Sequence, residues 1–399
     1  MYEILAIMAV FVFLYSITSG GLERTVINGA VVFTAFGLIF GPVGLGFLDL
    51  DVSHEGLRTL AELTLALVLF IDASNAKLGV LKQIFRMPTR LLLFGLPLTI
   101  LLGFGVGIFV FPGLTILEIA ILATLLAPTD AALGKAVVTD ESVPTNIRES
   151  LNVESGLNDG ICVPVLFVFL ALATSVGDDS ASMLALKLVA EEIGIGVVVG
   201  VGLTWLGALL LKRGNELGWV TETWKQLPVV ALAVACFAVA QALGGSGFIA
   251  AFVGGLFFGS IATQEQKHRL LLAAEGTADT MALITWVVFG AAIVGQKIGF
   301  FSWEVILYAV LSLTLIRMLP VFLVLTGLNL STGEKLFIGW FGPRGLASIV
   351  FAVIVLNHDL PGGDTIAITA ACTILLSIIG HGISANPLIA ALGKKIKPS

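Results

Sequence analysis

Apolar residues gather in thirteen stretches along the chain, and short polar segments separate each stretch from the next. A hydropathy window of about 19 residues places them at 4–19, 26–41, 57–74, 90–111, 114–138, 147–174, 184–211, 227–243, 247–263, 271–295, 303–327, 334–356 and 364–392. A helix of about 20 mostly apolar residues crosses a bilayer. The pattern therefore predicts an all-α, multi-pass membrane protein with thirteen transmembrane helices, numbered here in chain order. Because no long polar insertion interrupts it, we expect residues 1–399 to form one membrane domain without a soluble domain.

The composition excludes most other classes of protein. Hydrophobic residues make up 57% and charged residues 12% of the 399 positions, which is too little polar surface for a water-soluble protein of this size. The net charge of −6 comes without a basic stripe, so we expect no nucleic-acid partner. Cys162, Cys236 and Cys372 lie in separate apolar stretches. They show no metal or redox spacing, so we expect packing roles and no cofactor.

Lysine and arginine fall mainly on one side of the predicted helices. If the C-terminus is cytoplasmic, sixteen of the 21 basic residues face the cytoplasm. Arg58, Lys187 and Lys297 face the other side, whereas Arg317 and Arg344 lie within helices. The positive-inside rule then places the N-terminus outside and the C-terminus in the cytoplasm, which requires an odd number of helices. We expect a bacterial or archaeal cytoplasmic membrane.

Two of the predicted helices carry residues that interrupt a helix. Pro128 precedes Thr129 and Asp130 in helix five, and Gly342-Pro343-Arg344-Gly345 stands in the middle of helix twelve. Proline removes a backbone donor and clashes one turn back, so both helices should break. Helices five and twelve match if helices one to six repeat, inverted, as helices eight to thirteen, and such paired breaks point to a transporter site.

The breaks would leave exposed helix ends that need compensating charges. Asp130 would neutralise the positive N-terminal ends and Arg344 the negative C-terminal ends of the crossed half-helices. The competing interpretation is a pair of proline kinks whose charges are buried for packing alone.

Helix six carries a polar cluster at mid-membrane depth. Glu154, Ser155, Asn158 and Asp159 fall within about one turn and a half, with Ser155 and Asp159 at i and i+4 on one face. A carboxylate at the centre of a membrane helix costs about 2.5–3.5 kcal/mol and usually marks an ion or proton site. Hydroxyl, carboxylate and free carbonyl oxygens suit a small hard cation. We expect a monovalent one, because only one or two carboxylates point into the site.

These motifs together resemble the monovalent cation/proton antiporter superfamily. They are Pro128-Thr129-Asp130, Glu154-Ser155-Gly156-Leu157-Asn158-Asp159-Gly160, Arg317-Met318-Leu319 and Gly342-Pro343-Arg344-Gly345. The likeness runs over nearly the whole chain. The Asn158-Asp159 pair resembles the electroneutral branch, which includes bacterial NhaP-type sodium/proton antiporters and animal sodium/proton exchangers. The family usually has Thr-Asp-Pro, whereas proline here precedes Thr129 and alanine follows Asp130.

The resemblance implies a role for each polar residue. Asp159 would bind the transported cation or proton, with Thr129, Ser155 and Asp130 nearby; Glu154 and Asn158 would orient the site, with Glu154 paired to Arg317 on helix eleven. Asp72 on helix three stands where relatives often carry an acidic residue near the ion, or else forms a polar helix end. Asp279 would cap the start of helix ten, or line a cytoplasmic funnel. His54, His268 and His358 in loops and His381 in helix thirteen suit surface or packing roles, with pH sensing as the alternative.

The function implied is secondary active transport rather than enzyme catalysis. We expect exchange of Na⁺, or Li⁺, for H⁺ in a 1:1, electroneutral ratio by alternating access, with competition at Asp159. The core bundle would hold helices four to six and eleven to thirteen, and helices one to three and seven to ten would form a scaffold and the surface of a homodimer. The alternatives are a K⁺/H⁺ antiporter of the same fold, a cation channel and an intramembrane aspartyl hydrolase that uses Asp130 and Asp159.

Overall fold

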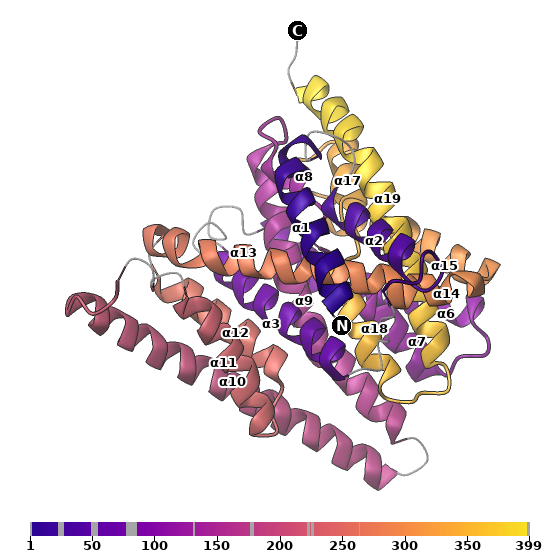
Figure 1. Cartoon of the computed structure of the whole chain (residues 1–399). Coiled ribbons are helices and arrows are strands. Elements are labelled where there is room, and N and C mark those ends of the chain that lie inside the picture. The colour runs from indigo at the N-terminus through magenta and orange to yellow at the C-terminus, as the bar shows by residue number, and fades with distance from the viewer. Residues whose placement is uncertain are drawn as a thin grey trace.

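The computed structural model of the chain is a bundle of helices (Figure 1). It describes residues 2–22, 28–48, 55–76, 86–130, 132–175, 179–221, 224, 227–262 and 264–396, without the side chains at 135, 179–182, 264–269 and 394–396. Some residues used to predict orientation, such as Arg24, Lys77 and Lys225, lie outside these ranges, as does His54. The side chain of His268 also lies outside the description.

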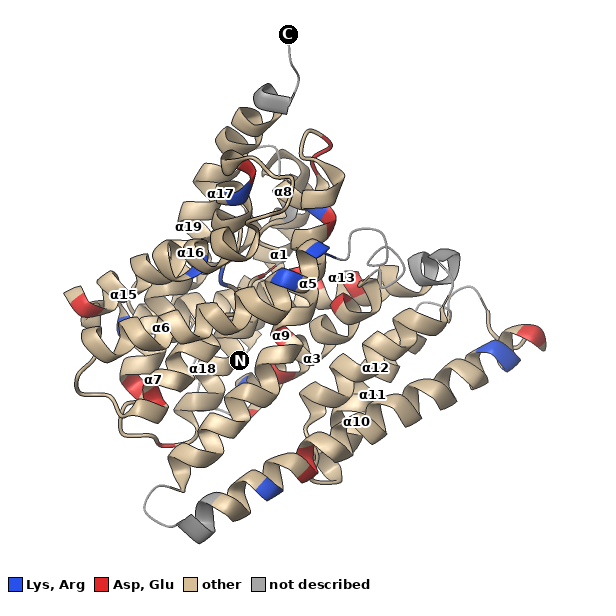
Figure 2. Cartoon of the chain, turned by 180° about the vertical axis from the view of Figure 1, so that it is seen from behind, with Lys and Arg blue, Asp and Glu red and all other residues tan. Residues whose placement is uncertain are grey.

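Each predicted stretch coincides with one helix or with consecutive helices of the chain. The all-α prediction is therefore confirmed for the described residues. The first half contains α1 (Tyr2–Leu22), α2 (Gly29–Phe40), α3 (Glu55–Asn75), α5 (Arg86–Arg90), the π-helix η1 (Leu91–Gly95), α6 (Leu96–Val110), α7 (Ile116–Leu125), α8 (Lys135–Thr139) and α9 (Thr145–Thr174). The long α10 (Asp179–Glu216) follows. Its charged residues lie toward its two ends, as Figure 2 shows.

The described part of the second half is also helical. It contains α11 (Pro228–Ala242), α12 (Gly247–Ile261), α13 (Gln264–Val288), the π-helix η3 (Phe289–Val294), α14 (Gly295–Lys297), the 3₁₀-helix η4 (Ile298–Phe300), α15 (Trp303–Leu313), α16 (Leu315–Val324), α17 (Thr332–Trp340), α18 (Leu346–Leu356) and α19 (Gly363–Ile396). Within the described residues, seven helices are long and apolar enough to span a membrane, and five further apolar helices are shorter. The number of crossings therefore stays a prediction.

The two breaks fall where the sequence predicts them. In the fifth stretch α7 ends at Leu125 and α8 begins at Lys135, and the described residues between them, 126–130 and 132–134, are not helical. In the twelfth, α17 ends at Trp340 and α18 begins at Leu346, with five non-helical residues between them. Capping boxes define where two of these half-helices start: Thr115 with Glu118 begins α7, and Ser331 with Glu334 begins α17.

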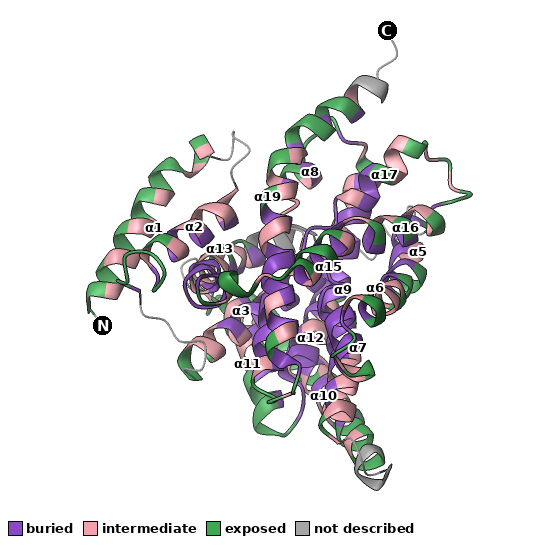
Figure 3. Ribbon diagram, turned by 90° about the vertical axis from the view of Figure 1, so that its right-hand side faces the viewer, coloured by how far each residue is buried: buried purple, intermediate pink, exposed green. Residues whose placement is uncertain are grey.

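The helices pack in two groups. Buried residues concentrate in the middle of the bundle (Figure 3). One group contains α3 and α10 to α13; the other group contains α6, α7, α9 and α15 to α19. Small residues allow close approach. Gly255 and Gly259 of α12 lie against the backbone of α3, where Ser74 Oγ donates to Gly255 O at 3.1 Å, as in the glycine-mediated contacts of membrane helices. In contrast, α1 has no buried residue and lies at the edge.

Candidate functional site

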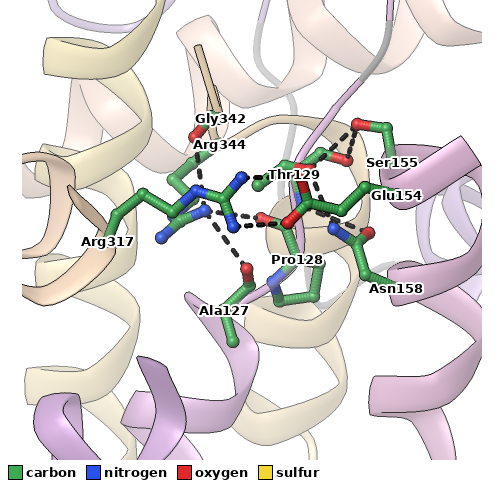
Figure 4. A network of polar contacts seen from close by, with 9 residues as sticks. All are labelled: Ala127, Pro128, Thr129, Glu154, Ser155, Asn158, Arg317, Gly342 and Arg344. Atoms are coloured by element: carbon green, nitrogen blue, oxygen red, sulfur yellow. Dashed lines mark hydrogen bonds and ion pairs between the residues drawn. The ribbon is translucent and has the colours of Figure 1, made fainter. Parts of the chain in front are cut away.

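The backbones of the two breaks touch each other. Figure 4 shows part of this crossing, with Pro128 and Thr129 from one break and Gly342 and Arg344 from the other. Asp130 N donates a hydrogen bond to Pro343 O at 2.8 Å. Because Pro128 and Pro343 lack an N–H group, neither segment can continue its helix. The non-helical backbone is buried inside protein, which is the condition under which it is tolerated at membrane depth.

Asp130 accepts hydrogen bonds from backbone groups on both sides of the crossing. Its Oδ2 accepts from Leu346 N, at the start of α18, at 2.9 Å. Its Oδ1 accepts from Ala132 N at 2.8 Å and Leu133 N at 3.2 Å, in the turn that precedes α8. The carboxylate thus lies at the positive end of a half-helix. Gly345 is required beside it, because a Cβ there would collide with the Asp130 carboxylate.

Arg344 makes the complementary contacts with carbonyl groups. It is fully buried, and its Nη1 donates to Ala127 O at 3.1 Å, Pro128 O at 3.2 Å and Gly342 O at 3.3 Å. Ala127 and Pro128 lie just beyond α7, which ends at Leu125. One guanidinium group therefore meets carbonyls at the negative end of this half-helix. These contacts occupy Nη1 of Arg344 with backbone oxygen, whereas its Nε and Nη2 have no hydrogen-bond partner among the described residues.

Asn158 and Ser155 of α9 hold Thr129 from the side. Asn158 Nδ2 donates to Thr129 Oγ1 at 2.8 Å, and Thr129 N donates to Asn158 Oδ1 at 3.3 Å. Ser155 Oγ lies 2.9 Å from Thr129 Oγ1 and donates to Thr129 O at 2.6 Å. Three oxygen atoms, the two hydroxyls and one carbonyl, therefore gather between helix six and the break of helix five (Figure 4).

Glu154 and Arg317 form a fully buried ion pair. The two bonds join Arg317 Nη1 to Glu154 Oε1 at 2.6 Å and Arg317 Nη2 to Glu154 Oε2 at 2.8 Å, and each side chain is 1% exposed. This bidentate geometry is the strong form of a charged pair. Gly342 is required here for space, because a Cβ on it would lie 2.5 Å from Arg317 Nε.

Asp159 is the one member of the cluster with an oxygen atom left without a partner. Its side chain is buried at 7% exposure, and Oδ1 has no hydrogen-bond partner among the described residues. It lies one turn beyond Ser155 on α9. Asp72 of α3 approaches the same face, since a Cβ on Gly156 would lie 3.3 Å from Asp72 O. The carboxylates of Asp72, Asp130 and Asp159 lie close enough to repel one another.

The charges at the crossing do not balance. Four carboxylates (Asp72, Asp130, Glu154 and Asp159) face two guanidinium groups (Arg317 and Arg344). Arg317 forms an ion pair with Glu154, and Nη1 of Arg344 donates to backbone carbonyls. Neither cation forms a hydrogen bond with Asp159. A buried ionised carboxylate without a partner is costly, so the site favours binding of a proton or a metal cation.

A cavity of about 380 Å³ reaches the crossing, where Asp130 lines it. Asn28, Thr139 and Asn386 also line it, and so does Asp279 of α13. The expectation that Asp279 caps a helix is wrong, because α13 begins fifteen residues earlier, at Gln264. Asp279 faces the cavity from the helix interior, as the alternative of a funnel predicted.

Two serines contribute to the crossing that sequence reasoning did not identify. Ser348 Oγ of α18 donates to Leu125 O at 2.8 Å, and Ser377 Oγ of α19 accepts from Arg344 N at 2.7 Å. Both are buried hydroxyls in apolar helices. Serine often bonds its own helix backbone, so the sequence alone offers no signal that distinguishes these two from the others.

Comparisons with known proteins agree with this architecture. Residues 7–391 match the family described as sodium/hydrogen exchanger, transmembrane. A K⁺/H⁺ antiporter NhaP2 of Shewanella sp. (strain MR-4) is 24% identical over 89% of this chain. The match spans only 61% of the length of that relative. A Na⁺/H⁺ antiporter of Schizosaccharomyces pombe is 24% identical over 92% of this chain and 85% of that protein.

The fold resembles a solved structure closely. The sodium proton antiporter MjNhaP1 from Methanocaldococcus jannaschii at pH 8 superposes with a TM-score of 0.73, at 21% sequence identity. The match covers 96% of this chain and 100% of that chain. At this level of identity the similarity establishes the fold.

Proposed function

We propose that this chain, which belongs to the sodium/hydrogen exchanger family, exchanges Na⁺ or Li⁺ for H⁺ across the membrane by alternating access. The observation that carries the proposal is Asp159, a buried carboxylate with a free oxygen atom and no cationic side chain bonded to it. Burial disfavours the charged carboxylate and a bound cation favours it. A proton and a metal ion therefore compete for the same group.

The ligands that we propose for the metal ion are oxygen atoms of four residues. Asp159 would supply the charge, Ser155 and Thr129 would supply hydroxyl or carbonyl oxygen, and Asp72 would add a carboxylate from α3. Oxygen ligands suit hard cations. In this proposal Asp130 acts chiefly through its charge, because both of its oxygens accept backbone N–H groups.

The stoichiometry follows from the neutral neighbour of Asp159. Asn158 carries no charge and is engaged with Thr129 through both its donor and its acceptor. One exchanging carboxylate then carries either one cation or one proton, so we propose 1:1 exchange that does not depend on membrane potential.

The movement that we propose follows the two packing groups. The core with α6, α7, α9 and α15 to α19 would move against a scaffold of α1 to α3 and α10 to α13, and the scaffold would form a homodimer. We further propose an outside N-terminus and a cytoplasmic C-terminus in a bacterial or archaeal cytoplasmic membrane.

K⁺/H⁺ exchange is the second candidate, because several relatives, at 24% identity, are K⁺/H⁺ antiporters. The site oxygens do not by themselves distinguish the two ions. Competition between Na⁺, Li⁺ and K⁺ on the same reconstituted protein decides between the candidates.

The test uses proteoliposomes with an imposed pH gradient and a fluorescent proton indicator. Each cation is added in turn, with and without a potassium ionophore that clamps the voltage. We expect Asp159→Asn to abolish cation-dependent proton movement, whereas Asp364→Asn, at a carboxylate 70% exposed in its ion pair, leaves it unchanged. Exchange retained by the Asp159 variant would overturn the assignment, and a signal that follows the membrane potential would rule out the 1:1 ratio.

A further inference from the structure

Two residues of α19 lie against the break between α17 and α18. Ser377 and His381 stand one turn apart and are 0% and 2% exposed. His381 Nε2 lies 2.8 Å from Trp340 O, and its ring stacks on the Trp340 indole with centroids 4.9 Å apart. On its other side, His381 Nδ1 lies 3.2 Å from Ser377 Oγ and 2.9 Å from Ser377 O.

The main contact has His381 as its donor, because the carbonyl oxygen of Trp340 can only accept. In a neutral ring with its hydrogen on Nε2, Nδ1 is an acceptor, and its hydrogen-bond partner is then the Ser377 hydroxyl rather than the Ser377 carbonyl. Trp340 is the last residue of α17, and its carbonyl also accepts from Gly342 N at 2.8 Å in the turn that leaves the helix. The histidine therefore holds the C-terminal end of α17 together with the first turn of the break.

Ser377 holds the other end of the same segment. Its hydroxyl accepts the backbone N–H of Arg344 at 2.7 Å, two residues before α18 begins. The pair on α19 thus spans the break, with His381 at Trp340 and Ser377 at Arg344. No intrahelical bond can do this, because the segment has left helical geometry.

The negative C-terminal ends of α7 and α17 are compensated by different side chains. Arg344 meets the carbonyls that follow α7, whereas His381 meets the last carbonyl of α17. Arg344 reaches only Gly342 O on the α17 side, at 3.3 Å. Helix-end compensation at α17 therefore depends on a residue of helix thirteen.

We propose that His381 is a positioning residue for the cation site. It fixes Trp340–Arg344, and Pro343 O of this segment accepts the backbone N–H of Asp130, which directly follows Thr129. A loosened break would therefore displace the Thr129 oxygens relative to Ser155. The effect should appear as weaker cation binding rather than as a slower maximal rate.

The experiment compares His381→Gln, His381→Asn and His381→Phe in proteoliposomes, at equal reconstituted amounts. Glutamine can extend a carboxamide N–H toward Trp340 O, asparagine is one methylene shorter, and phenylalanine keeps a ring without a donor. We expect the apparent KM for Na⁺ to rise about tenfold in the Asn and Phe variants, as loss of one buried hydrogen bond allows, with the maximal rate within about twofold. The Gln variant should stay within about threefold of wild type in KM.

His358→Phe is the matched control. His358 makes the same contact between Nδ1 and the carbonyl one turn back, Ile354 O at 2.9 Å, but it is exposed and far from the break. Ser377→Ala removes the bond to Arg344 N and should also raise KM, which keeps the proposal testable if the Phe variant fails to fold.

Equal KM in the Gln and Asn variants, or an unchanged KM in both Asn and Ser377→Ala variants, would overturn the positioning role. The proposal rests on the proposed function, because the cation site that His381 would position belongs to it. Absence of exchange in the wild-type protein would contradict that function, whereas the ratio between variants tests His381 separately.

Discussion

Removing both partners of the Glu154–Arg317 pair should destabilise the protein less than the two single removals added together. Both side chains are 1% exposed, and two bonds of 2.6 and 2.8 Å join them. Loss of one partner leaves a buried charge without compensation, which costs about 3–5 kcal/mol. Replacing both by neutral residues removes that penalty, so Glu154→Gln/Arg317→Met should lose far less than the two single variants together.

The expected change in melting temperature can be worked out from chain length. An unfolding entropy of about 2.1 cal/mol/K per residue over 399 residues gives about 1.2 °C per kcal/mol. Each single variant, Glu154→Gln or Arg317→Met, should therefore melt about 4–6 °C below wild type.

The buried cysteines provide the assay. Cys162, Cys236 and Cys372 are all free and buried, so a thiol-reactive fluorescent dye reports unfolding of the detergent-purified protein. The control is Lys297–Asp364, a pair at 2.5 Å whose side chains are 28% and 70% exposed. Its single variants should cost at most about 1 kcal/mol. A single Glu154 or Arg317 variant that melts within 1 °C of wild type, or a double variant that falls by the sum of both, would refute the reasoning.

Three further predictions concern the transport site. Gly345→Ala should reduce exchange at least tenfold, because the added Cβ collides with the Asp130 carboxylate; Gly105→Ala, where nothing lies within 4 Å, is the control, and equal exchange rates would contradict the assignment. Asn158→Asp should make any remaining exchange sensitive to membrane potential and raise the cation KM, since the donor to Thr129 Oγ1 is lost; voltage-clamped vesicles measure both. Ser155→Ala should raise the Na⁺ KM about tenfold through loss of one oxygen ligand while proton-indicator assays show an unchanged maximal rate, and an unchanged KM would exclude Ser155 as a ligand.

The helices and their breaks could be predicted because the signals are local. Long apolar stretches mark membrane helices, and proline at 128 and 343 removes the donor that a helix needs. The start of α13 was not predictable in this way, because its first turns carry the polar residues 264–269. The hydropathy pattern therefore begins the helix too late, at residue 271, and places Asp279 near its start, whereas Asp279 lies in its interior.

Contacts between helices were harder to predict from the sequence. Segments such as α6 and α12 are apolar on every side, so their sequences do not indicate which face is buried. The bonds of Ser348 and Ser377 depend on how each helix is rotated about its axis. That rotation is set by packing against neighbours that lie far away in the chain.

The crossing has a consequence for how the chain is assembled during synthesis. Asp130 N finds its acceptor on Pro343, 213 residues later, and Arg344 N finds Ser377 another 33 residues on. Until α19 leaves the ribosome, the polar backbone of the interrupted twelfth helix lacks one of its partners in a medium that offers no water to replace it. A nascent chain truncated before residue 377 should therefore stay sensitive to membrane proteases. We expect the crossing to fold only when the last helix has been inserted, rather than step by step as each helix enters the membrane.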